Sequence, residues 1–168
     1  IHQRMKVFLR DQSLRHDLID ACLSLDEGDD LALSVKKSFA LTDFIKTSDG
    51  SNLIQGFKRA NNILLQAEQK DGVEYSYGAD LKYVEEGSER NLFYALDNEE
   101  VKIRSALEKE DFVEAMNAMA NLRTPIDNFF ETVQINSDVD VIRRNRLNLL
   151  SRICKLCLSV ADLTKVEG

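Results

Sequence analysis

Two segments of the chain carry basic side chains of a kind that binds phosphate. The first is "FKRANNIL", which contains Lys58 and Arg59. The second is a predicted helix whose basic side chains are Arg143, Arg144, Arg146, Arg152 and Lys155. An Arg guanidinium matches the geometry of phosphate oxygens, and release of counterions favours binding of basic groups to a nucleic acid. Both segments are therefore candidate contacts for nucleic-acid phosphates.

The formal net charge of −7 conceals an uneven distribution of charge. Residues 71–114 hold 13 acidic and 5 basic side chains, whereas residues 138–155 hold 2 acidic and 5 basic ones. A charged helix face is usually only solvated, and these arginines have acidic neighbours at Asp127, Asp138 and Asp140. The residues alone thus leave three alternatives open: a solvated face, internal ion pairs, or a surface for RNA or a protein partner.

No motif in the sequence indicates catalysis. The sequence has no glycine-rich phosphate loop, no nucleophile elbow and no metal-ligand spacing, so we expect no catalytic residue and no metal site. "CKLC" at 154–157 has redox spacing, but it lies inside an apolar-periodic helix, which favours core packing. Three cysteines indicate a reducing compartment, and no apolar run is long enough to span a membrane. We therefore expect a cytoplasmic protein.

The composition predicts an all-α fold, because the chain has no Trp, one Pro and only 7 Gly among many good helix formers. Apolar periodicity predicts helices over 1–25, 29–47, 50–70, 88–111, 111–123, 124–133 and 139–163, the last being the longest. Ser88 is the expected N-cap of the fourth helix. The acidic, Gly-containing stretch 71–87 is expected to be a connection between two helical parts, 1–70 and 88–168.

The single proline lies in "LRTPIDNFF". Thr124 is expected to cap a new helix with Pro125 in its first position, where the missing N–H costs nothing. Ile126, Phe129 and Phe130 then fall on one helical face, which places both rings in the core. Pro125 should therefore end one helix and start the next at a changed angle.

The stretch "LRTPIDNFFETVQINSDVDVIRRNRLNLLSRICKLCLSVADLTKV" resembles the C-terminal end of the beta subunit of bacterial glycyl-tRNA synthetase. That family has the pattern L-R-x-P-[VI]-D-x-F-F-[DE]-x-V, then an acidic turn, R-x-N-R-L-x-L-L and V-A-D-[FL]-[ST]-K. Upstream, "FLRDQSLRHDLIDACLS", "GFKRANNIL" and "LKYVEEGSERNLFYAL" are similar to further segments of the same subunit. One departure is visible, since the family's common V-M-V-M is "VQIN" here, at Val133–Asn136.

The resemblance implies a class II ligase with separate subunits in an alpha2beta2 assembly. The alpha subunit carries the ATP and glycine chemistry, and the beta subunit recognises tRNA-Gly. The resemblance also implies a C-terminal helical bundle similar to the anticodon-binding domain of arginyl-tRNA synthetase, preceded by helices that pack on it. On this basis the chain is a non-catalytic part of the enzyme that binds no cofactor itself. The alternative is a scaffold module of the tetramer without direct RNA contact.

Anticodon bases are unpaired, so a protein reads them by stacking and by hydrogen bonds to their edges while basic groups hold the backbone. The residues that the resemblance places as candidate RNA contacts are Lys58, Arg59, Asn61, Asn62, Arg143, Arg144, Asn145 and Arg146. Asn145 and Arg146 have a structural alternative, in which they tie their helix to the "TPID" turn.

Overall fold

The computed structural model describes residues 16–23 and 31–167, and all regular secondary structure within them is helical. The elements are α2 (His16–Leu23), α3 (Leu31–Lys46), α4 (Ser48–Asp71), η1 (Leu81–Tyr83), α5 (Gly87–Glu108), α6 (Phe112–Ala120), α7 (Arg123–Thr132), α8 (Asp140–Leu158) and η2 (Leu163–Lys165). The predicted all-α fold is confirmed. The first part of the helix expected over 1–25 lies outside the described residues.

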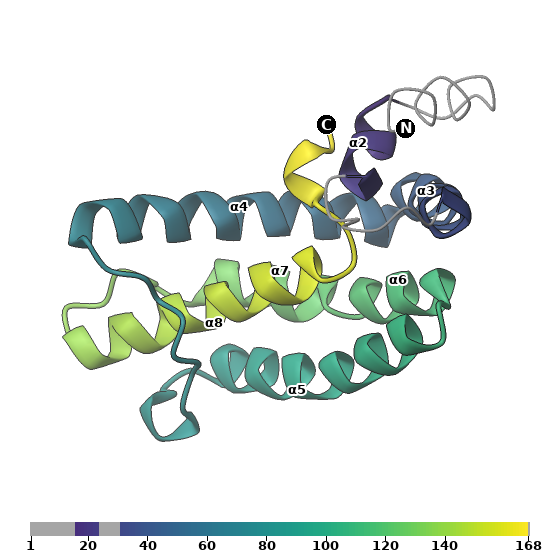
Figure 1. The fold of residues 1–168 in the computed structure, drawn as a ribbon. Coiled ribbons are helices and arrows are strands. Elements are labelled where there is room, and N and C mark those ends of the chain that lie inside the picture. Colours follow the sequence, from purple (N-terminus) through teal and green to yellow (C-terminus); the bar gives the residue numbers. More distant parts are fainter. Residues whose placement is uncertain (1–15, 24–30, 168) are drawn as a thin grey trace.

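Helix α4 runs along one side of the bundle and α5 along the other, with α8 between them (Figure 1). Helix α4 packs against α3, α6, α7 and α8, and α5 packs against α6, α7 and α8. The largest fully buried side chains include Phe57 from α4, Leu92 from α5 and Phe129 from α7. Their burial removes apolar surface from water and supplies the main favourable term in folding. The described helices thus share one hydrophobic core.

The expected start of α7 is wrong by a few residues. Helix α7 begins at Arg123 after Leu122, so Thr124 is not its N-cap and Pro125 lies inside its first turn. The first intrahelical bond runs from the N–H of Ile126 to the carbonyl of Leu122, at 3.0 Å. An N–H at position 125 would have no partner within this helix, so the proline removes no helical hydrogen bond.

Two further helix ends differ from the predictions. Helix α5 begins at Gly87 after the N-cap Glu86, and Ser88 instead shares a hydrogen bond with Thr132 at the end of α7. Helix α8 ends at Leu158 rather than at residue 163, and α4 with 24 residues is longer than α8 with 19. The chain turns after α8 because Val160 and Ala161 enter the core there.

That turn also joins the two ends of the described chain. The N–H of Asp162 donates a 2.9 Å hydrogen bond to the carbonyl of Ala21 in α2, so η2 packs beside α2.

Cys154 and Cys157 lie in the core, as their helical spacing predicted. Burial raises the pKa of the Cys154 thiol to about 12. These thiols are core side chains and not a redox pair.

The segment between α4 and α5 is held by contacts to α4 and α8. Tyr75 is buried, and its N–H donates to the carboxylate of Glu68 in α4 at 2.9 Å. Further along, the backbone of Asp80 exchanges two hydrogen bonds with the side chain of Asn145 in α8. The division of the chain into 1–70, 71–87 and 88–168 stays a prediction.

Candidate nucleic-acid interface

Helix α4 carries the first group of predicted contacts. Arg59 and Asn62 are exposed, whereas Lys58 and Asn61 are half-buried. Within the part of the chain that the structure describes, none of these four side chains is joined to a carboxylate. Their charges and amide groups are therefore available to a ligand.

Arg59 reaches the neighbouring helix α7. Its guanidinium lies over the ring of Phe130, 4.5 Å from the ring centroid. Gly56 permits this close approach of α4 to α7, because a Cβ at position 56 would stand only 3.0 Å from Cγ2 of Ile126. Phe130 is half-buried rather than fully in the core, and its ring meets that of the buried Phe129 edge-on at 5.7 Å. Both predicted core rings are thus packed, but only Phe129 is wholly covered.

A groove follows Arg59 along the same face of α4. Its cavity volume is about 330 Å³, and its apolar floor includes Ile63, Ile135 and Leu147. The polar side chains that line it are Gln66, Lys70, Asn136 and Arg143. The groove therefore lies between α4, the turn that follows α7, and the first half of α8. It combines an apolar floor with amide and cationic groups, which suits an unstacked base next to a phosphate.

Arg143 lies at the centre of a hydrogen-bond network on the wall of this groove. Its Nη1 lies 2.8 Å from Oδ2 of Asp71 and 3.3 Å from the Tyr75 hydroxyl, and its Nε donates to Oδ1 of Asn136 at 2.7 Å. The Tyr75 hydroxyl donates to the same Asp71 carboxylate at 2.5 Å. The hydrogen bonds from Tyr75 and then from Arg143 lower the pKa of Asp71. The Arg143 charge is largely balanced, so this side chain positions the turn as well as lining the groove.

Asn145 and Arg146 lie inside the protein. Asn145 accepts a hydrogen bond from the Asp80 N–H at 2.7 Å and donates to the Asp80 carbonyl at 3.1 Å. Arg146 donates to the Gln134 carbonyl at 2.5 Å and forms a buried ion pair with Glu89 at 2.8 Å. This burial favours the structural alternative for both residues. Their partners are the 71–87 segment, the turn after α7 and helix α5, so the expected link to the "TPID" turn is wrong.

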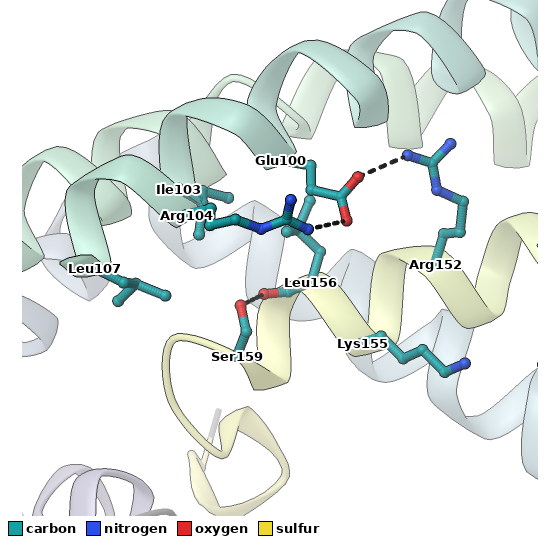
Figure 2. Close-up of a pocket in the computed structure, with 8 residues that line it drawn as sticks. All are labelled: Glu100, Ile103, Arg104, Leu107, Arg152, Lys155, Leu156 and Ser159. Carbon is teal, nitrogen blue, oxygen red and sulfur yellow. Dashed lines mark hydrogen bonds and ion pairs between the residues drawn. The ribbon is translucent and has the colours of Figure 1, made fainter.

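Of the remaining predicted basic strip, Arg152 pairs with α5. Figure 2 shows Glu100 between Arg104 and Arg152, with one carboxylate oxygen directed at each. Arg152 lies 2.8 Å from Asp97 and 3.3 Å from Glu100, and the cavity beside it has a volume of about 220 Å³. The arginines of α8 pair mainly with carboxylates of α5, and not with the sequence neighbours Asp127, Asp138 or Asp140.

The structure thus separates the eight predicted contacts. Lys58, Arg59, Asn61 and Asn62 belong to α4 but do not line the groove, whereas Arg143 lines it from α8. Arg144 is exposed and forms no ion pair within residues 16–23 and 31–167.

Sequence reasoning missed three groove residues. Gln66 and Lys70 stand seven and eleven positions after Arg59, a helical spacing that would have identified them. No helical spacing identifies Asn136 as a groove residue, because its position depends on the conformation of the turn between α7 and α8.

The sequence of residues 53–167 matches the family described as the DALR anticodon binding domain. The chain belongs to this family. The match begins in α4 and includes all of α5 to α8, so it contains the groove and the Arg59–Phe130 contact. No helix among residues 16–23 and 31–167 is long and apolar enough to cross a membrane.

Curated relatives agree with the family match. The chain is 62% identical over 99% of its length to the glycine–tRNA ligase beta subunit of Ruegeria sp. (strain TM1040). It is 61% identical to the subunit of that name from Dinoroseobacter shibae and 44% identical to that from Rhodospirillum centenum. The predicted resemblance to this subunit is confirmed. The chain spans 23–24% of the length of these relatives.

Proposed function

We propose that this chain binds the anticodon region of tRNA-Gly as part of the beta subunit of a glycyl-tRNA synthetase. The observation that carries this proposal is the α4 face of a DALR anticodon binding domain, where Lys58 and Arg59 form no ion pair with a carboxylate among the described residues. Unpaired cations retain their full attraction for RNA phosphates, whereas the paired arginines beside α5 do not.

The chemistry of the groove fits unpaired RNA. Glycine anticodons end in two cytosines, and each cytosine edge offers an amino donor and carbonyl and ring-nitrogen acceptors. Amide side chains such as Asn62 and Gln66 carry both a donor and an acceptor, so they can hydrogen-bond to such an edge. Arg59 and Lys70 stand at the two ends of this row and would hold the RNA backbone. The α4 face thus offers phosphate contacts and base-edge contacts side by side.

The same proposal assigns this chain a role within the whole enzyme. The chain would act in the cytoplasm, in an alpha2beta2 assembly whose alpha subunit binds ATP and glycine and carries out the ligation. In that assembly this chain contributes tRNA positioning and no catalytic group or cofactor contact.

A binding experiment with matched charge reversals tests the proposal. Labelled tRNA-Gly, and the same tRNA with both anticodon cytosines replaced, are titrated into the chain at several salt concentrations. Lys58→Glu/Arg59→Glu on the α4 face should weaken binding about 10- to 100-fold. The control Arg104→Glu/Lys155→Glu changes the net charge equally on the α5 side and should leave the affinity within about twofold.

The outcomes separate the two candidate functions. Binding that weakens with salt, with the anticodon change and with the α4 reversal supports an anticodon reader. Absence of binding, or binding that ignores the anticodon, contradicts it and favours the scaffold alternative, in which the basic residues contact a protein subunit.

A further inference from the structure

The Arg59–Phe130 contact has a counterpart on the other side of the molecule. Arg152 in α8 lies over the ring of Phe93 in α5, with its guanidinium 5.4 Å from the ring centroid. Nη2 of Arg152 contacts two carboxylates, those of Asp97 and Glu100. Arg59 has the same cation–π arrangement without a carboxylate partner among the described residues. The two pairs therefore differ in whether the guanidinium is already engaged.

The support beneath Arg59 is rigid. Phe130 is held edge-on against Phe129, whose side chain is fully buried. Attraction between the guanidinium and the negative face of the ring holds Arg59 over Phe130. Arg59 is exposed, so the side of its planar guanidinium that faces away from Phe130 is open to a second planar group. A guanidinium stacks on nucleobases as well as on aromatic side chains.

The position of this pair suits a single-stranded RNA loop. Ile63, one helical turn after Arg59, begins the apolar floor of the groove. Lys70 lies three turns after Arg59, about 16 Å along the helix axis. A strand that follows α4 would meet the Arg59–Phe130 pair, then the apolar floor, then the Lys70 ammonium. This combination of stacking surface and spaced cations is typical of single-strand binding sites.

We propose that Arg59 and Phe130 form a stacking platform for one unpaired nucleobase of the bound RNA, in which the base lies on the outer side of the Arg59 guanidinium. This inference rests on the proposed RNA-binding function and adds a contact to the face of a base. The platform reads no base edge, so it accepts any nucleobase and orients the strand for the edge contacts in the groove. Arg152 and Phe93 form no such platform, because the Arg152 side chain is only 20% exposed and its charge is balanced by Asp97 and Glu100.

The test separates planarity from charge. Arg59→Lys keeps the positive charge but removes the planar group, and Phe130→Leu removes the ring but keeps an apolar side chain. Arg152→Lys is the matched control at the other cation–π pair. Each variant is titrated with the anticodon stem-loop of tRNA-Gly and with a series in which one loop nucleotide at a time is abasic. Urea unfolding of each variant checks that the fold is retained.

The platform predicts about tenfold weaker binding of the intact loop for Arg59→Lys and for Phe130→Leu, with unchanged salt dependence and no effect of Arg152→Lys. One abasic position should weaken wild-type binding by a similar factor, and Arg59→Lys should then cause no further loss. Wild-type affinity of Arg59→Lys, or equal losses with every abasic loop, would overturn the platform while leaving RNA binding intact. If the wild-type chain bound no loop, the proposed function and the platform would fail together.

Discussion

The α4 face and the α5 face of the bundle each place an arginine over a phenylalanine ring, and the two faces differ in the surrounding acids. On the α5 face, Asp97 and Glu100 bind Arg152, and Glu100 also binds Arg104. On the α4 face, Arg59 has no carboxylate partner among the described residues, and it is followed by a groove with amide side chains. Availability of the cation, and not its presence in the sequence, distinguishes the two surfaces.

This difference explains why α8, which carries the most basic side chains of the described helices, does not form the surface with the most available positive charge. The acidic segment that precedes α8 supplies Asp71, Glu89, Asp97 and Glu100, and each of them pairs with an arginine of α8. The exposed pairs among these, those of Arg152, contribute little to stability, but they reduce the attraction of the arginine for phosphate. Among the described residues, no carboxylate forms an ion pair with Lys58 or Arg59 of α4.

The buried Arg146–Glu89 pair should show the largest effect of any change on the α5 side. Glu89→Gln leaves the Arg146 charge uncompensated in the interior and should lower the free energy of unfolding by about 3–5 kcal/mol. Urea unfolding measures this value. The control is Glu100→Gln, whose carboxylate is 41% exposed and whose loss should cost under about 1 kcal/mol. Equal losses in both variants would contradict the assignment of Arg146 to the interior.

Asn145 provides the next largest effect. Asn145→Ala removes two hydrogen bonds to the Asp80 backbone and should destabilise the chain by about 1–3 kcal/mol. Limited proteolysis should also cut residues 72–86 faster, because this side chain ties the segment to α8. The control Asn62→Ala, on the outer face of α4, should change stability by less than about 0.5 kcal/mol. An intact 72–86 segment in Asn145→Ala would show that the contacts of Tyr75 and Ser76 are enough to hold it.

Asp71 gives a pH-dependent effect beside the groove. Its pKa is lowered in the folded chain by hydrogen bonds from Tyr75 and then Arg143, so its stabilising contribution is present above the unfolded pKa of about 3.9. That contribution is lost as the pH falls through the lower folded pKa. The stability difference between wild type and Asp71→Asn should therefore be constant above about pH 5 and shrink below about pH 4. Urea midpoints from pH 2.5 to 7 measure it, and a difference that does not change with pH would contradict the network.

The smallest expected effect concerns single lysines on the two faces. Lys58→Ala should lower the slope of log affinity against log salt by about 1, because one phosphate contact is lost. Lys155→Ala, on the α5 side, should leave the slope unchanged. Fluorescence titration with tRNA-Gly at several salt concentrations gives both slopes. Equal reductions in the two variants would remove the distinction between the faces.

The sequence predicted what depends on local periodicity. The apolar spacing in α7 placed Ile126 and Phe129 correctly in the core, and the same spacing identified the buried thiols of α8. Helix ends were less predictable, since α8 stops where Val160 and Ala161 turn into a core built partly by α2. Capping preferences alone contain no information on such tertiary contacts.

The candidate site was predicted only in part for a related reason. Lys58 and Arg59 are on the proposed interface because no carboxylate of the described residues pairs with them. Arg146 and Arg152 pair with Glu89 and Glu100, which lie more than 50 positions earlier in the chain, and these ion pairs keep the two arginines away from the proposed interface. No spacing rule connects residues so far apart, so the ion pairs of α8 became visible only in the folded structure.

Lysine footprinting compares the two faces most directly. The chain, alone and saturated with tRNA-Gly, is treated briefly with an acetylating reagent, and the modification of each lysine is measured by mass spectrometry. The account predicts that the RNA protects Lys58 and Lys70 on the α4 face and leaves Lys102 and Lys155 as reactive as in the free chain. Protection of Lys102 and Lys155 with unchanged Lys58 and Lys70 would contradict the central claim and move the RNA-binding surface to the α5 side.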